Sequence, residues 1–161
     1  VSTDQLTQIA NRRGLLQAFD AERSRLERAG SALAVGLLDI DNFKRINDER
    51  GHAVGAEALA HLAKVARNCM RPQDTLARYG GEEFVILLPD TPLDQGIEAM
   101  VRLQRDLTKK FFLDGAEKLL ITFSAGVAQL SPDEDSESAI KRADKAMYAA
   151  KRAGKNRVLG A

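Results

Sequence analysis

The chain has 161 residues, of which 44% are hydrophobic and 29% charged, and this composition indicates one globular domain and excludes disordered and low-complexity classes. Lys and Arg together number 24 and Asp and Glu 23, so a formal net charge of +1 gives no overall electrostatic reason to bind nucleic acid, and no nucleic-acid partner is expected. One cysteine, Cys69, excludes an internal disulfide and a cysteine metal cage, and the longest apolar run is far shorter than the roughly 20 residues that span a bilayer.

In the first part of the chain, the hydrophobic pattern predicts one helix before a buried strand and one helix after it. Apolar residues at helical spacing predict a first helix over residues 11–28, which ends before Gly30. The continuous apolar run at 32–38 predicts a central strand that ends at the acidic segment 39–41. The residues that follow are interpreted as a loop leading into a second helix over about 59–70, which Pro72 ends.

The second part of the chain predicts a hairpin followed by alternating helices and strands. Two short strands are predicted at 75–79 and 84–88 around Gly80-Gly81. The pattern then predicts a third helix over 93–107, a strand over 119–127, a last helix over about 140–150 and a short edge strand at 157–159. This mixed order predicts an α+β fold, with helices packed on a central, mostly antiparallel sheet.

Two acidic clusters are the strongest chemical signal in the sequence. Asp39-Ile40-Asp41 ends the predicted central strand, and Glu82-Glu83 lies at the tip of the predicted hairpin. Carboxylates at the point where a strand leaves the core are costly unless a cation meets them, and oxygen ligands from two neighbouring strand ends suit Mg²⁺. Solvated loop acids are the alternative interpretation, which the presence of two such clusters weakens.

Other residues leave two interpretations open. Gly80-Gly81 either makes a tight turn or lets a ligand approach the backbone closely. His52 is either a hydrogen-bonded structural histidine or a ligand. Lys151 and Lys155 either complement the dipole at the end of the last helix or meet an anion.

Residues 78–84 resemble the GGEEF form of the signature of the GGDEF domain of diguanylate cyclases. The resemblance extends along nearly the whole chain. Further segments match the family's motifs in the same order, at residues 4–7, 11–13, 39–48, 51–55, 124–127 and 143–156.

The resemblance implies a palm-like fold of the nucleotidyl cyclase or ferredoxin-like type, with residues 1–161 forming a single GGDEF domain. Because the sequence starts at Val1 rather than Met, we expect a domain excised from a larger signalling protein with an upstream sensory or dimerisation module. The implied activity is condensation of two GTP into cyclic di-GMP with release of two pyrophosphates, by a homodimer with Mg²⁺, or Mn²⁺ as an alternative. The domain is expected to be cytoplasmic, with membrane anchoring of the full-length protein left open.

The resemblance also assigns roles residue by residue. It implies that Asp39, the carbonyl of Ile40, Glu82 and Glu83 hold the metal, with Glu82 as proton acceptor. The implied nucleotide-binding residues are the backbone at Asn42, Phe43 and Lys44 for phosphates, Asn47 for guanine, His52 in the pocket wall, Gly80 and Gly81 against the nucleotide, and Lys151 and Lys155 for the terminal phosphates.

The chain departs from the family pattern at two places. Residues 8–10 differ from the usual Gly-Leu-Pro, which concerns a turn, whereas Ala56 replaces the Asp that reads the guanine edge together with Asn47. We therefore expect weakened guanine recognition. Two alternatives stay open: a catalytically poor domain that acts as a nucleotide or cyclic di-GMP receptor or interaction module, and a cyclic dinucleotide synthase of relaxed specificity.

A second site is suggested by Arg71 and Asp74, which form an R-x-x-D five residues before Gly80. In isolation this tetrapeptide is a loop after a helix with a surface ion pair. Its spacing matches the family's inhibitory site, and Arg102 matches the family's secondary arginine. Because arginine pairs with phosphates and stacks on guanine, the resemblance implies that cyclic di-GMP binds at Arg71, Asp74 and Arg102.

Overall fold

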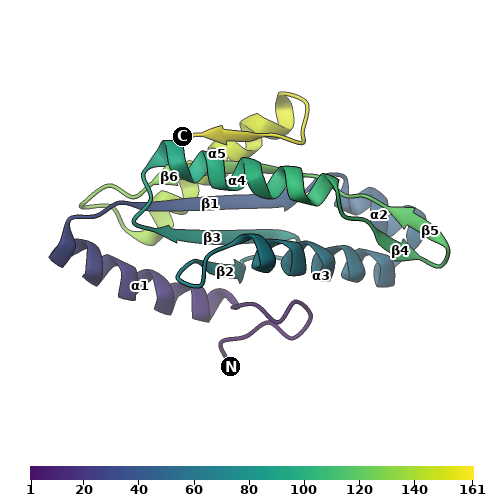
Figure 1. Ribbon diagram of the computed structural model, residues 1–161, viewed down its shortest axis with the longest axis horizontal. Helices are drawn as coiled ribbons and strands as arrows, with labels where there is room; N and C mark the ends of the chain where they lie inside the picture. Colours follow the sequence, from purple (N-terminus) through teal and green to yellow (C-terminus); the bar gives the residue numbers. More distant parts are fainter.

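The computed structural model describes all residues, 1–161, and its centre is a five-stranded sheet in the order β2-β3-β1-β6-β7 (Figure 1). The first four strands in this order pair antiparallel, and β7 pairs parallel to β6. The predicted α+β fold with helices around a mostly antiparallel sheet is therefore confirmed. The strands of this sheet are β1 (Leu33–Ile40), β2 (Thr75–Arg78), β3 (Glu83–Pro89), β6 (Phe123–Gln129) and β7 (Val158–Gly160).

Five helices and a small hairpin complete the fold. The hairpin joins β4 (Phe112–Asp114) to β5 (Glu117–Leu119) at one end of the molecule, beside α2 (Figure 1). None of the helices is both long and apolar enough to cross a membrane. The helices are α1 (Arg12–Ala29), α2 (Phe43–Arg50), α3 (His52–Cys69), α4 (Leu93–Thr108) and α5 (Ser136–Arg152).

Helices cover both faces of the sheet, because β1 is buried along its whole length and its side chains alternate between two cores. Ala34, Leu38 and Ile40 pack in the core formed with α3 and α4. Leu33, Val35 and Leu37 pack in the core formed with α1 and α5. The last residues of β1 therefore emerge between two packed layers, at the end of the molecule where α2 lies (Figure 1).

Two parts of the predicted element order are wrong. The segment interpreted as a loop before the second helix forms the eight-residue helix α2, which has no fully buried residue and packs on the core only through Phe43 and Ile46. The predicted strand over 119–127 is two strands: β5 pairs with β4 outside the main sheet, and β6 starts only at Phe123. The β2–β3 hairpin and the edge strand β7 lie where the sequence predicts them.

Candidate active site

The two acidic clusters meet at one end of the sheet, because Asp39 at the end of β1 pairs with Glu83 at the start of β3. Asp39 is 5% exposed, and its Oδ2 accepts a hydrogen bond of 2.6 Å from Lys151 Nζ. Its other carboxylate oxygen, Oδ1, is buried and has no hydrogen-bond partner. A buried carboxylate oxygen without a partner is costly, so this oxygen suits a cation or a proton donor.

The electrostatics of this site are those of crowded carboxylates. Burial raises the pKa of Asp39 above its ordinary value, against the opposing effect of Lys151. Burial also raises the pKa of Glu82, and the nearby Asp39 carboxylate raises it further. Both shifts mean that the charged forms are disfavoured in the protein by itself. A divalent cation between the two groups would reverse that preference.

The donor set fits Mg²⁺ rather than a metal held by protein side chains alone. No group of three or more His, Cys, Asp or Glu side chains is arranged to hold a metal ion. Mg²⁺ commonly takes one or two carboxylates and completes its shell with water and substrate phosphates. Asp39 and Glu82, with Ile40 beside them in the adjoining cavity, supply such a partial oxygen shell.

A cavity of about 650 Å³ opens next to these carboxylates. Its wall includes Glu82, Lys151 and Lys155, together with Asn42, Phe43 and Lys44 at the start of α2. The first N–H groups of a helix lack intrahelical partners and attract anions, so this end of α2 suits phosphate groups. The predicted phosphate-binding residues thus line one space with Ile40 and Glu82, two of the candidate metal residues.

The end of α5 is fixed beside α2 by a short contact. Lys155 Nζ donates a hydrogen bond of 2.6 Å to Asn42 Oδ1, and both residues have a left-handed backbone, with φ of 64° and 59°. Lys151, in the last turn of α5, is the lysine paired with Asp39. Two ammonium groups therefore lie over the cavity, one against a carboxylate and one against an amide.

The residues expected to recognise guanine lie apart from the phosphate end. Asn47, His52 and Ala56 are not in the wall of the cavity. Asn47 on α2 lies directly on α3 at Gly55, where an added methyl group would overlap the Asn47 side-chain oxygen. Ala56, the next residue, is half-buried, and His52 is exposed at the start of α3. The structure therefore brings Asn47 against Gly55, the residue before Ala56.

The two glycines of the hairpin differ in their surroundings. A side chain at Gly80 would come within 2.7 Å of Glu83 Oε1, whereas nothing lies within 4 Å of a methyl placed on Gly81. Arg78 holds the turn by donating to the Gly81 carbonyl at 2.8 Å. A side chain at Gly80 would displace the Glu83 carboxylate, whereas Gly81 leaves open space for a ligand.

Glu83 has surroundings different from those of Glu82. Burial raises the pKa of Glu83, and the negative charges of Asp144 and Asp39 raise it further. The positive charges of Lys151 and Arg12 oppose this shift. Glu82 lines the cavity and Glu83 does not. The sequence does not predict that Asp144 lies near Glu83, because only the packing of α5 on the sheet brings this carboxylate to the hairpin.

Asp41 is a structural residue, although it belongs to the same acidic cluster as Asp39. It is 5% exposed and accepts hydrogen bonds from Thr122 Oγ1 and Ser124 Oγ, both at 2.6 Å, and from the Asn156 N–H at 2.9 Å. These bonds tie the end of β1 to β6 and to the segment after α5 that carries Lys155. The one sequence signal for this role is that Ser124 and Asn156 belong to matched segments of the family.

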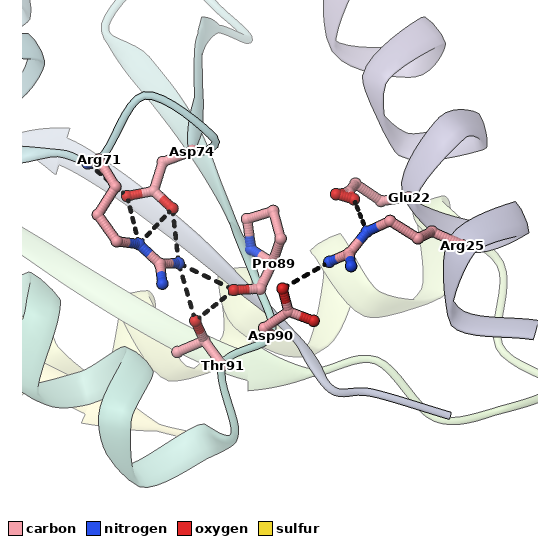
Figure 2. A network of polar contacts seen from close by, with 7 residues as sticks. All are labelled: Glu22, Arg25, Arg71, Asp74, Pro89, Asp90 and Thr91. Carbon is pink, nitrogen blue, oxygen red and sulfur yellow. Dashed lines mark hydrogen bonds and ion pairs between the residues drawn. The ribbon is translucent and has the colours of Figure 1, made fainter. Parts of the chain in front are cut away.

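The predicted inhibitory residues also lie together, around a separate cavity of about 270 Å³ whose wall includes Arg71, Asp74 and Arg102. Figure 2 shows that the Arg71 guanidinium is held by Asp74, by the carbonyl of Pro89 at 2.9 Å and by Thr91 Oγ1 at 3.1 Å. The Asp74 side chain is 2% exposed, so it serves as the buried anchor of the more exposed arginine.

Comparison with known proteins gives consistent matches along the chain. The family profile described as "Diguanylate cyclase, GGDEF domain" matches residues 1–157. Diguanylate cyclase DgcP of Pseudomonas aeruginosa is 43% identical over 156 residues, which are 97% of this chain and 23% of DgcP. The chain spans between 23% and 36% of the length of the curated relatives compared with it.

Solved structures agree with the fold. The GGDEF domain of DgcB from Caulobacter crescentus, in complex with c-di-GMP, has a TM-score of 0.92 at 34% identity, covering 99% of this chain and 92% of that one. Diguanylate cyclase SiaD from Pseudomonas aeruginosa, in complex with its activator SiaC, has a TM-score of 0.95 at 34% identity, covering 99% of this chain and 61% of that one.

Proposed function

The chain belongs to the GGDEF domain family of diguanylate cyclases, and from this membership we propose that it condenses two GTP into cyclic di-GMP and releases two pyrophosphates. The observation that carries the proposal is the pairing of Asp39 with Glu83, which puts Asp39 and Glu82 beside a cavity lined by the start of α2 and two lysines. Paired carboxylates next to a phosphate-binding helix end are the arrangement that metal-assisted phosphoryl chemistry requires.

Mg²⁺ fits the unpartnered Asp39 Oδ1, and we assign Asp39, the Ile40 carbonyl and Glu82 as its protein ligands, with Glu83 supporting a second ion. When bound, the metal polarises the α-phosphate and helps to activate the attacking 3′-hydroxyl. Mn²⁺ is the alternative, since it accepts similar oxygen ligands.

The protein's own residues bind the triphosphate and accept the proton. Lys151 and Lys155 face the terminal phosphates, and the first N–H groups of α2 bind the phosphates nearer the reacting centre. Glu82 is assigned as the proton acceptor, because its carboxylate lines the cavity that would hold the triphosphate. Each domain of a homodimer presents one GTP, so we expect the rate to rise more than linearly with protein concentration.

The direct test is product identification by mass spectrometry after incubation with GTP and Mg²⁺. Asp39→Ala and Glu82→Gln should abolish turnover with an unchanged circular dichroism spectrum, whereas the exposed Glu137→Gln serves as a control that should stay active. Near-wild-type product formation by either site variant would disprove the assignment of the metal site.

Position 56 decides between full and weakened guanine recognition. A carboxylate there would accept hydrogen bonds from guanine N1–H and the 2-amino group, at about 1.5–3 kcal/mol each, and Ala56 makes neither bond. We propose weak GTP binding and reduced discrimination against ATP. Ala56→Asp should raise kcat/KM for GTP by about tenfold, if one such bond is regained.

Reactions with GTP, ATP and both together separate the alternatives. Mixed or adenine-containing products favour a synthase of relaxed specificity, and binding without any product favours a receptor. A wild-type protein that is already fully active and strictly specific for GTP, and unchanged by Ala56→Asp, would show that another residue reads the base.

Product inhibition is proposed at the second cavity, where Arg71, Asp74 and Arg102 meet. Two guanidinium groups in one cavity suit the phosphates and guanine faces of cyclic di-GMP. Calorimetry should show cyclic di-GMP binding to the wild type and its loss in Arg71→Ala. Equal binding by both proteins would contradict this site.

A further inference from the structure

The β4–β5 hairpin has an apolar face that no other part of the chain covers. Side chains alternate along the two strands, so Phe111, Leu113 and Leu120 share one face, and they are 46%, 54% and 59% exposed. Lys118 lies on the same face, with its ammonium 4.8 Å from the centre of the Phe111 ring. Exposed large apolar side chains gathered in this way mark an interaction surface more often than scattered ones do.

The opposite face of the hairpin makes contacts within the chain. The Phe112 ring lies 5.1 Å from the His61 ring of α3. Asp114 and Glu117 both pair with Arg50, the last residue of α2. The acidic side chains of the hairpin strands are therefore paired with Arg50 on the other face, and the outer face keeps only apolar and positive groups.

A basic hollow of about 380 Å³ adjoins this outer face. Three lysines, Lys64, Lys109 and Lys110, line it, no acidic residue does, and none of the three forms an ion pair. Burial lowers the pKa of His61 in the hollow, and the charges of Lys64 and Lys110 lower it further. Phe111 belongs to both the hollow and the outer face, so the two form one continuous surface.

We propose that this hairpin surface, made of the basic hollow and the outer face of β4–β5, docks an acidic protein segment that also carries apolar side chains. Carboxylates of the segment meet the three unpaired lysines, and its apolar groups cover Phe111, Leu113 and Leu120. Single-stranded nucleic acid fits less well, because the surface offers one exposed aromatic ring where strand binding uses a series of them.

The surface is also placed to influence α2. Arg50 ties the inner face of the hairpin to the last turn of the helix whose first turn lines the nucleotide cavity. The docking itself depends only on the charge and apolarity of the surface, so its test is independent of the proposed cyclase activity.

The first measurement uses synthetic probes with the whole chain. A short fluorescein-labelled peptide composed of Glu, Leu and Gly should bind in fluorescence anisotropy, and should shift the amide signals of residues 109–120 in heteronuclear NMR spectra. Peptides with Lys in place of Glu, or Ser in place of Leu, should bind at least about tenfold more weakly. No measurable binding of the Glu and Leu peptide at low ionic strength would overturn the proposal.

Protein variants locate the binding. K64E/K109E/K110E and, separately, L113S/L120S should each weaken the peptide at least about tenfold, with circular dichroism unchanged. K141E/K145E, which reverses two lysines at exposed positions of α5, is the charge-reversal control and should bind as the wild type does. Peptide affinity unaltered by both surface variants, or tighter binding of a single-stranded oligonucleotide than of the peptide, would overturn the assignment.

Discussion

Replacing Asp41 by Ala should destabilise the protein much more than replacing Asp39 by Ala, although both aspartates are 5% exposed. Asp41 accepts hydrogen bonds from Thr122, Ser124 and Asn156, which come from β6 and from the two segments that flank it in space. Asp39 has one oxygen paired with Lys151 and one oxygen with no partner.

The size of the difference follows from these partners. Hydrogen bonds to a charged group contribute about 1.5–3 kcal/mol each, so the three bonds of Asp41 set an upper limit of roughly 5–9 kcal/mol. Removing the carboxylate also removes its own desolvation cost, and the freed hydroxyls can turn to other acceptors, so we expect a net loss of about 3–5 kcal/mol. Asp39→Ala loses the ion pair with Lys151 but also removes a buried carboxylate that has only one partner. We expect these two effects to offset each other to within about 1 kcal/mol.

Urea unfolding at pH 7, followed by circular dichroism, measures both changes. With a slope of about 2 kcal/mol per molar urea, Asp41→Ala should lower the midpoint by about 1.5–2.5 M, and Asp39→Ala by no more than about 0.5 M. Equal midpoints for the two variants would refute the division into a structural and a catalytic aspartate.

Three further outcomes are expected. Glu82→Gln should raise the urea midpoint of the ligand-free protein at pH 7, because the raised pKa of Glu82 in the folded state means that its charge destabilises the fold. This gain in the midpoint should vanish as pH falls below the ordinary pKa of a glutamate, and a gain independent of pH would contradict the reasoning. Gly55→Ala should raise the KM for GTP, because the added methyl group displaces Asn47. The Tm should not rise, although Gly→Ala within a helix usually stabilises a protein by about 0.5–1 kcal/mol. An unchanged KM would show that Asn47 does not contribute to nucleotide binding. Arg142 lowers the pKa of Glu134 to about 2, and this ion pair stabilises the fold above pH 4.5 and loses its effect as pH falls toward 2. Glu134→Gln should therefore have a lower Tm than the wild type at pH 7, and its Tm should change less with pH between 4.5 and 2. Parallel Tm profiles of the two proteins would contradict this prediction.

Some elements were predictable because their sequences carry a local pattern. The apolar run that forms β1 and the strands flanking Gly80-Gly81 indicate a buried strand and a hairpin without any tertiary information. Helix α2 is eight residues long and packs on the core only through Phe43 and Ile46, so its hydrophobic pattern is too short to distinguish it from a loop. The extent of the strand predicted over 119–127 was wrong, because β5 pairs with β4 and only Phe123–Gln129 joins the main sheet, and strand pairing is a choice between distant segments.

The candidate site divides in the same way. The motifs around Asp39 and Glu82 are contiguous and ordered along the chain, so they identify the family and the residue types of the site without any structure. Packing between distant segments then gives Asp41 hydrogen-bond donors 81 to 115 residues away, while Asp39 keeps an unpartnered oxygen. The same packing pairs Asp114 and Glu117 with Arg50 and leaves the lysines around Phe111 without ion pairs. The physical reason is that a carboxylate's role depends on its desolvation and on which donors reach it, and in a fold built from distant strands and helices those donors come from parts of the chain that no local pattern connects.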